Sequence, residues 1–476
     1  MNSPIDAPPT IPPTRIRYRV LAMACGLSMI TYLDRVCLGS AAPAIAKELS
    51  LSSVAELKWA FTAFTIAYAL FEIPSGWLGD RLGPRSTLIR IVLFWSTFTA
   101  LTGAVGLKVG SLTLGGLGTL ITLRFLFGAG EAGAYPNITR AIHNWFPMRQ
   151  WETAQGWIWM SGRLMGGLTP LIWAILVGGT AMSAPLTTWR GAFWLFSALG
   201  ILWCIVFAIG FRDTPEQHPA VNPAEASLIR DDNAPPQPHA RIDWGQLLSN
   251  PALWALCVMY SLVNYGWAFN ITYLPAYLQL RFAVPENDLI AAIYKGAPLW
   301  VGAAGCLLGG QIINLLARRT GDRRRARQVL GFCALTGCAL CWLGVKAAPN
   351  IHLFSLLVSL AAFCIDLTLG ATWATCQDIG RPNVAVAAAC MNTIGTLGAA
   401  FANWLTGTLV ESSLASHAAQ MATTVEKLST SAKLDASMSG YQTVFTTYVV
   451  TYIIAAACWT LIRPRDPRAR FTSPAQ

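Results

Sequence analysis

The sequence predicts an all-α membrane protein with twelve transmembrane helices in two six-helix halves. Of its 476 residues, 54% are apolar and only 12% are charged, and the mean hydropathy is +0.47. A soluble protein of this length carries roughly twice that charge density. The apolar residues gather into runs of about 20, the length of helix that crosses a ~30 Å hydrocarbon core. Because the backbone must satisfy its own hydrogen bonds inside a bilayer, each run is expected to be helical.

The apolar runs divide evenly around one polar segment. Residues 211–250 are rich in proline and in charges of both signs, which is typical of a linker. We therefore predict an N-terminal six-helix half at 1–210, a cytoplasmic linker at 211–250 and a C-terminal six-helix half at 251–476. The predicted spans are 20–41, 59–78, 87–107, 114–135, 156–179, 189–210, 253–278, 291–316, 329–345, 351–376, 384–409 and 441–462.

The net charge of +11 is distributed as a membrane topology requires. If both termini are cytoplasmic, 21 of the 34 basic residues fall in cytoplasmic segments, 9 fall in outer segments and 4 lie within spans. This is the positive-inside pattern. The basic charge therefore indicates orientation in a cell (inner) membrane rather than affinity for nucleic acid. A second polar stretch, 411–440, is expected to be a long outer loop with at most a short surface helix.

A short motif follows the second span and has a partial copy in the other half. It reads Gly-Trp-Leu-Gly-Asp-Arg-Leu-Gly-Pro-Arg from Gly76 to Arg85. The copy runs from Gly310 and has Asn314 in place of the acid at Asp80, 234 residues later. Paired halves of this kind are the usual plan of secondary transporters, with the binding site between the halves.

The pattern G-x-x-x-D-R-x-G-x-R between spans 2 and 3 resembles the loop signature of the major facilitator superfamily. The resemblance implies the major facilitator fold, with a cytoplasmic gate that Asp80 and Arg81 close by tying the two halves together. Because Asn314 lacks a charge, the gate is expected to be asymmetric. The predicted gate residues are Gly76, Asp80, Arg81, Gly83 and Arg85.

Charged residues inside spans cost several kcal/mol unless they are paired, so each one points to function. Equal numbers of cations and acids in the first half predict a neutralised network. Arg124 and Glu131 are seven residues apart and should share one helix face. Arg163 either pairs with Glu72 or adds a cation for a doubly charged substrate. The charges are Arg35, Arg124 and Arg163 with Asp34, Glu72 and Glu131, and a further acid, Asp366, lies in span 10.

Four spans resemble those of the anion:cation symporter family, which includes galactonate, hexuronate and sialin-like carriers. The similar segments are Tyr32-Leu-Asp-Arg35 to Pro43, Gly128-Ala-Gly-Glu131 to Asn137, Asn264-Tyr-Gly-Trp267, and Met391-Asn392-Thr393. The resemblance implies that Asp34 and Glu131 are the proton-coupling carboxylates. It also implies substrate contacts from Tyr32, Arg35, Arg124 and Asn392, to which Arg163 is added.

The function that this resemblance implies is proton-coupled symport of a small organic anion by alternating access. The anion would be a sugar acid, an aldarate or another carboxylate. Two alternatives stay open, an organic-anion or phosphate-ester exchanger without proton coupling and a non-transporting membrane sensor. An enzyme is not expected, because the sequence contains no nucleophile–base pair, metal cluster or nucleotide-binding loop. We expect a monomer whose partners are the anion and the bilayer, with no cofactor besides the proton.

Overall fold

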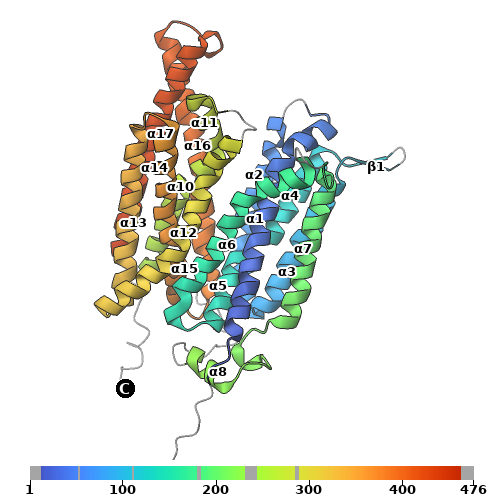
Figure 1. Cartoon of the computed structure of the whole chain (residues 1–476), viewed down its shortest axis with the longest axis vertical. Coiled ribbons are helices and arrows are strands. Elements are labelled where there is room, and N and C mark those ends of the chain that lie inside the picture. The colour runs from blue at the N-terminus through green and yellow to red at the C-terminus, as the bar shows by residue number, and fades with distance from the viewer. Residues whose placement is uncertain are drawn as a thin grey trace, which may run out of the picture.

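The structure, a computed structural model, describes residues 12–51, 54–109, 112–178, 184–230, 244–284 and 289–462. The long helices run roughly parallel in two groups that lie side by side (Figure 1). The first group holds α1 (Ile16–Glu48), α2 (Lys58–Leu82), α3 (Pro84–Ala104), α4 (Leu117–Glu131), α5 (Ala134–Trp145), α6 (Trp151–Trp173) and α7 (Trp189–Gly210). The second holds α10 (Pro251–Thr272), α11 (Leu274–Phe282), α12 (Leu289–Thr320), α13 (Arg323–Lys346), α14 (Ile351–Leu367), α15 (Leu369–Gly380), α16 (Val384–Gln420) and α17 (Thr430–Leu461).

Short elements mark the two ends of the bundle. A hairpin of β1 (Leu107–Val109) and β2 (Leu112–Leu114) lies at one end, called here the hairpin end. Helix α1 begins and α17 ends at the opposite, terminal end, where α8 (Pro223–Arg230) lies beside the start of α1 (Figure 1). Helix α9 (Trp244–Leu248) precedes α10. Parts of the three predicted chain divisions, at 1–11, 231–243 and 463–476, lie outside the described residues.

The helices account for the twelve predicted spans. Among the described residues, ten helical segments are long and apolar enough to cross a membrane. Helix α2 and the α4–α5 pair supply the remaining two. The span of α4 and α5 breaks at Gly133, whose φ of +83° and close approach to Ser75 leave no room for a side chain. Pro136 lies in the first turn of α5, where its missing N–H is harmless.

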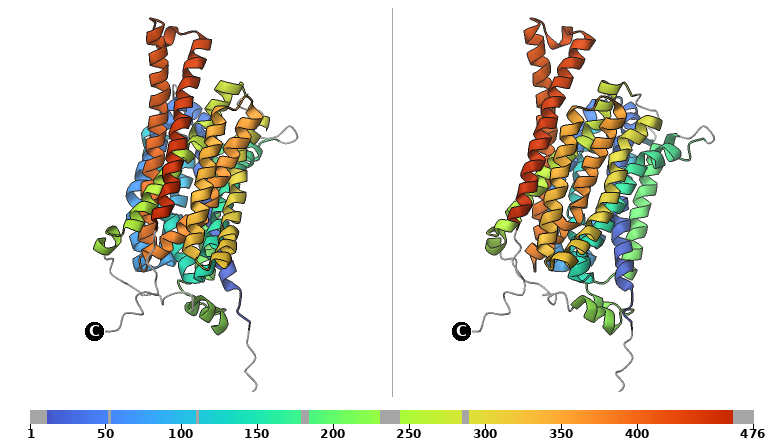
Figure 2. Two further views of the ribbon diagram at one scale, coloured as in Figure 1. Left: turned by 90° about the vertical axis from the view of Figure 1, so that its left-hand side faces the viewer. Right: turned by 60° about the vertical axis from the view of Figure 1, so that its left-hand side comes forward.

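The prediction of a loop at 411–440 is wrong. Helix α16 continues to Gln420 and α17 starts at Thr430, so most of the stretch is a pair of helices that projects beyond the bundle (Figure 2). The Ala- and Ser-rich sequence lacks the apolar run of a span but contains no helix-breaking residue before the turn after Gln420. Helix formation in this segment depends on the chain's local propensity, which the hydropathy pattern does not report.

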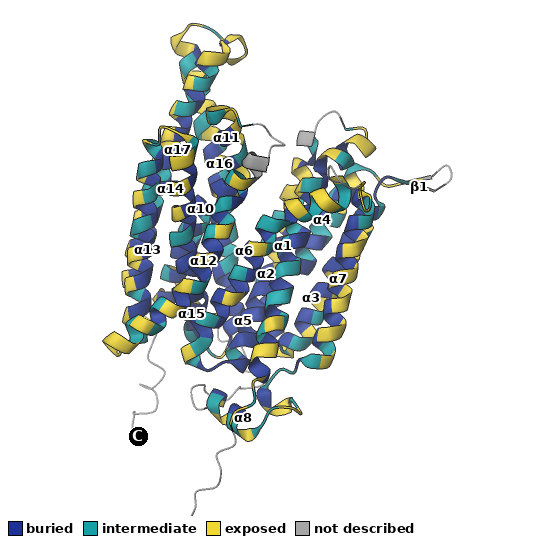
Figure 3. Ribbon diagram, in the orientation of Figure 1, coloured by how far each residue is buried: buried dark blue, intermediate teal, exposed yellow. Residues whose placement is uncertain are grey.

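Burial follows the expected membrane arrangement. Exposed residues form stripes along outer helices such as α7 and α13, whereas α5 and α15 at the centre of the terminal end are buried almost throughout (Figure 3). The two halves meet mainly where α2 packs on α16 and α6 packs on α12. Their ribbons lie closer together at the terminal end than at the hairpin end (Figure 1).

Glycines make the close approach of the halves possible. A Cβ added to Gly76 of α2 would lie 2.7 Å from the Ala385 oxygen of α16, and one added to Gly310 of α12 would lie 2.8 Å from the Thr153 Cα of α6. Gly76 and Gly310 hold corresponding places in the repeated motif. The repeat therefore provides two matched contacts that only glycine permits while the terminal end is closed.

We expect Gly76→Ala to disfavour the closed terminal end. Overpacking of this kind costs about 1–3 kcal/mol, which lowers the ratio of closed to open molecules by roughly 5- to 150-fold. Spin labels at the exposed positions Ser86 of α3 and Arg324 of α13 would report the separation of the halves. Gly39→Ala is the matched control, because a Cβ there meets nothing within 4 Å. Identical distance distributions for both variants would contradict the argument.

Candidate functional site

The centre of the bundle contains an ion pair between Arg35 of α1 and Glu131 of α4. The Arg35 Nε lies 2.5 Å from the Glu131 Oε1. Glu131 is fully buried, whereas the Arg35 side chain is 28% exposed and its guanidinium lies 4.8 Å from the centre of the Tyr68 ring. Arg35 is therefore a cation that is held by one carboxylate and one aromatic face and still has an accessible edge.

Asp34 and Arg124 lie beside this pair without direct ion partners. Both carboxylate oxygens of Asp34 are buried and accept no hydrogen bond, and the Arg124 Nε is also without a partner. The Arg124 guanidinium lies 4.2 Å from the centre of the Phe127 ring. Arg124 and Glu131 are both buried side chains of α4, but the ion partner of Glu131 is Arg35. Ionising Asp34 in this position without an ion partner would cost several kcal/mol.

Arg163 of α6 does not pair with Glu72, so the first of the two alternatives that the sequence left open for Arg163 is wrong. Its Nε and Nη2 instead donate to the two oxygens of Asp366 on α14, at 3.0 and 3.1 Å. Its Nη1 donates to the Tyr32 hydroxyl at 2.7 Å, and its guanidinium lies 3.9 Å from the centre of the Trp267 ring. Arg163 pairs with Asp366 of the other half rather than with Glu72 of its own half, because a buried cation needs an acid in direct contact and Asp366 lies on a helix that reaches it.

Glu72 of α2 bonds to the other half through Asn392 of α16. The Asn392 Nδ2 donates to the Glu72 Oε1 at 2.5 Å and lies 3.3 Å from the Tyr68 hydroxyl. The Thr393 hydroxyl donates to the second Glu72 oxygen at 3.5 Å. Asn392, which the resemblance predicts to contact substrate, is half-buried. The contact between Glu72 and Asn392 was not predicted from the sequence.

Aromatic rings surround the central charges, although nothing in the sequence marked them as part of the site. Tyr135 stacks on Trp159 with ring centres 4.4 Å apart, and Trp373 of the other half lies 5.4 Å from Trp159. We call these three rings, together with Tyr68 at Arg35 and Trp267 at Arg163, the aromatic wall. Aromatic faces stabilise guanidinium groups and exclude water. No spacing in the sequence distinguishes these residues from ordinary interface aromatics.

Asp80 joins the halves at the terminal end. It accepts the backbone N–H groups of Ala385 and Val386, the first turn of α16, at 3.1 and 2.9 Å. Its carboxylate also lies 3.4 Å from the Arg140 guanidinium, which donates to the Pro382 carbonyl of the other half. A carboxylate at a helix N-terminus is favoured by the free N–H groups and the helix dipole. We call Asp80, Arg140 and the start of α16 the first latch.

The other predicted gate residues build the turn beneath Asp80. Gly83 has a φ of +86°, and Arg81 lies over the Trp77 ring, 5.1 Å from its centre. The Arg85 N–H donates to Asp213 at the start of the linker at 2.8 Å, and its side chain donates to the Ala208 carbonyl of α7 at 2.6 Å, so neither contact reaches the second half. Burial raises the pKa of the Asp213 carboxyl above its ordinary value, an effect that the Arg85 N–H partly offsets.

A second latch lies at the partial copy of the motif. Asn314 of α12 accepts from Arg323 of α13 at 2.6 Å and donates to Thr153 of α6 at 3.3 Å. The acid that the copy lacks comes from Glu152 of α6, which accepts two bonds from Arg323, at 2.9 and 2.8 Å, and one from Arg327, at 2.7 Å. The two latches therefore differ in chemistry, as the loss of the acid at Asn314 predicted, but Glu152 was not identified from the sequence.

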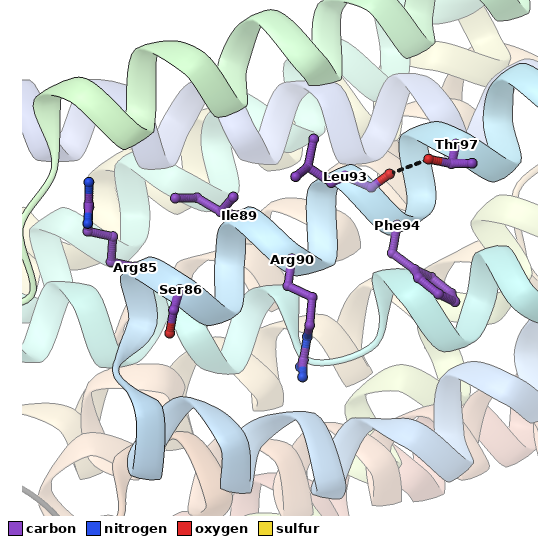
Figure 4. Close-up of a pocket in the computed structure, with 7 residues that line it drawn as sticks. All are labelled: Arg85, Ser86, Ile89, Arg90, Leu93, Phe94 and Thr97. Carbon is purple, nitrogen blue, oxygen red and sulfur yellow. Dashed lines mark hydrogen bonds between the residues drawn. The ribbon is translucent and has the colours of Figure 1, made fainter.

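A hollow lies along α3 on the surface of the first half. It has a volume of about 630 Å³ and is lined by Arg85, Ser86, Ile89, Arg90, Leu93, Phe94 and Thr97, all on α3 (Figure 4). Helix α3 packs against α2, α4, α5 and α7, which belong to the same half. The hollow is thus separate from the central charges and is no part of the candidate site.

We expect Asp80→Asn and Glu152→Gln each to shift the molecule toward opening at the terminal end. Hydrogen bonds to charged groups contribute about 1.5–3 kcal/mol, so the ratio of closed to open molecules should fall roughly 10- to 150-fold. The spin-label distance between positions 86 and 324 measures this. Glu216→Gln is the control, since its ion pair with Arg230 is exposed and does not join the halves. A distance unchanged in both latch variants would show that the latches carry no closing energy.

Comparison with known proteins places these features in a wider group. The sequence profile of the Major Facilitator Superfamily matches residues 24–403. The chain is 31% identical over 383 residues to a probable sulfoacetate transporter of Cupriavidus necator, covering 80% of this chain and 84% of that protein. It is 27% identical to a probable L-galactonate transporter of Escherichia coli, covering 83% and 84%. A crystal structure of a proton:xylose symporter superposes with a TM-score of 0.70 at 14% identity, covering 94% and 96% of the two chains.

Proposed function

Because this chain belongs to the major facilitator superfamily, a family of membrane transporters, we propose that it is a proton-coupled symporter of small organic anions. The sulfoacetate and L-galactonate transporters that it resembles are named for organic acids, which supports an acidic substrate. The observation that carries the proposal is the Arg35–Glu131 ion pair at the centre of the bundle. Its cation is partly exposed, and its acid is fully buried. We place the protein in the inner membrane as a monomer with both termini cytoplasmic.

Coupling follows from competition for one cation. Arg35 stays charged at all accessible pH values and needs a counter-anion in an apolar bundle. Glu131 supplies that anion while it is ionised. When Glu131 takes a proton, its attraction for Arg35 is lost and the exposed edge of the guanidinium accepts the carboxylate or sulfonate of a substrate. Protonation of Glu131 and binding of the anion to Arg35 therefore occur together, because either one alone would leave an unpaired buried charge.

Asp34 and Arg124 extend the same logic. Asp34 is buried with no ion partner in direct contact and with the Trp95 side chain as its neighbouring donor, and Arg124 is the cation whose charge acts on it. Asp34 interacts unfavourably with the charge on Glu131, so the two acids are not independent. We propose that Asp34 is the second proton-coupling carboxylate. In this scheme Arg124 turns between Asp34 and the rings of Phe64 and Phe127 as the protons come and go.

Alternating access requires that the latches open and the hairpin end close. In the described state the first and second latches hold the terminal end together, and Glu72–Asn392 joins the halves at the centre. Given the proposed orientation, this state receives substrate from the outer side. Tyr32 and Asn392, both half-buried at the centre, are the proposed neutral contacts for the rest of the anion.

Glu131→Gln should abolish accumulation of substrate driven by a pH gradient while sparing counterflow exchange. A glutamine is fixed in the neutral state, so it leaves Arg35 free for the anion but carries no proton. Proteoliposomes loaded with unlabelled anion report exchange, and an imposed pH step reports the driven uptake. Glu411→Gln, an exposed position on α16 away from the centre, is the matched control.

The outcomes separate the alternatives for this chain. Driven accumulation by the Gln variant would place the coupling proton elsewhere, with Asp34 the next residue to change. Loss of exchange as well would make Glu131 a structural or binding residue. An unchanged protein that exchanges anions but never concentrates them under a pH step would be an uncoupled exchanger. One that binds anions without moving them would be a sensor.

A further inference from the structure

The ion pair between Arg163 and Asp366 is not used by the coupling scheme above. It joins α6 of the first half to α14 of the second at the centre of the bundle. Both side chains are buried, with exposures of 5% and 0%, and two parallel hydrogen bonds of 3.0 and 3.1 Å connect them. It is a second, independent pairing of a cation with an acid, with the same composition as Arg35 and Glu131.

A permanent pair at this place would oppose transport. Removing either partner leaves a buried charge, a loss of several kcal/mol, so the pair holds α6 and α14 together as long as both groups are charged. Alternating access moves the halves against each other around the site. The pair must therefore be able to exchange partners, and the substrate is the one new anion that arrives at each cycle.

We propose that Arg163 and Asp366 form a second acidic-group subsite and that the preferred substrate is a small organic dianion. Its second carboxylate or sulfonate replaces Asp366 on Arg163, and Asp366 takes up a proton from the aqueous side. One O–H bond forms at the Asp366 carboxylate, and Arg163 keeps one anionic partner throughout. This inference rests on the proposed symport and adds to it a substrate class and one further proton.

The position of Arg163 suits a short substrate with acidic groups at both ends. Arg163 donates to the hydroxyl of Tyr32, which lies three residues before Arg35 on α1. Residues three apart lie next to each other on one helix face, so the two arginines border the same turn of α1. Trp267 lies against the Arg163 guanidinium at 3.9 Å and keeps that cation in place when its anionic partner changes.

The surroundings of Asp366 allow it to be neutral after the exchange. The charged or titratable groups that face it are Arg163 of α6 and the Cys306 thiol of α12, with the phenols of Tyr32 of α1 and Tyr452 of α17 beyond them. Arg163 is the only cation in this set, so a substrate that takes Arg163 leaves Asp366 without a counter-charge. The carboxyl also lies against bare backbone, because a Cβ on Gly302 would be 2.3 Å from its Oδ2.

The test compares matched anions in proteoliposomes. Galactarate and galactonate differ only in whether the far end is a carboxylate or a hydroxymethyl group, and sulfoacetate and acetate differ only in the sulfonate. We expect the unchanged protein to take up one more proton with galactarate than with galactonate. Arg163→Gln should raise the KM for galactarate and sulfoacetate roughly 10- to 150-fold, as loss of charged hydrogen bonds implies, and change that for galactonate far less. Arg163→Lys should restore much of the preference.

Asp366→Asn isolates the extra proton. It should keep exchange of galactarate while its uptake carries one proton fewer than in the unchanged protein, and the number of protons carried with galactonate should stay the same. Equal losses for mono- and dianions in the Arg163 and Asp366 variants would overturn the inference and make the pair a structural clamp. If the unchanged protein accumulates none of the four anions under a pH step, the proposed symport itself fails and this inference falls with it. Binding of each anion to the purified variants, measured by thermal shift, verifies that they are folded.

Discussion

Every charge at the centre of this protein has to be neutralised, because the surrounding bundle is apolar and the bilayer supplies no water. The rest of the arrangement depends on that constraint. Arg35 is held by Glu131 and Arg163 by Asp366, while Arg124 rests on aromatic faces. Under the proposed mechanism, such a site admits an anion only when one of its own acids gives up its charge. Substrate binding and proton binding would then depend on the same electrostatic balance.

The same constraint connects the centre to the ends of the molecule. Two of the contacts at the centre, Glu72–Asn392 and Arg163–Asp366, run between the halves, so any change in their charge also changes how strongly the halves attract each other. The latches at the terminal end use the same kinds of interaction near water, where carboxylates meet arginines and the free N–H groups at the start of α16. Local protonation can thus alter the balance between conformations without a separate signalling device.

The repeated motif shows how the two halves reach similar ends with different residues. Gly76 and Gly310 both permit a close helix crossing, which is a matter of backbone shape and tolerates no replacement. The acid is less constrained, because its charge can come from any residue that reaches the same place. Asp80 supplies it in one half and Glu152, from a neighbouring helix, supplies it opposite Asn314. The two copies of the motif therefore share their backbone contacts but differ in the residue that supplies the acid.

The sequence by itself determined the class of protein, the helical spans and the residues whose charges matter. Hydropathy and the positions of Arg and Lys report the bilayer directly, because a helix that crosses it must be apolar over about 20 residues. The same pattern failed at 411–440, where the helices leave the apolar run behind. It also singled out Arg35, Glu131 and Asp366, because a buried charge is conspicuous in an apolar run.

Only the tertiary structure decided which charge meets which. Pairing with Glu72 was one of two alternatives for Arg163, which instead pairs with Asp366, and Glu131 pairs with Arg35 rather than with the cation on its own helix. Partners on different helices are set by how the helices pack and rotate against one another, and spacing along the chain carries no record of it. The aromatic wall and Glu152 escaped notice for the same reason. Glu152 and Trp159 have partners in the other half, far away in the sequence. These contacts form only when the two halves close on each other.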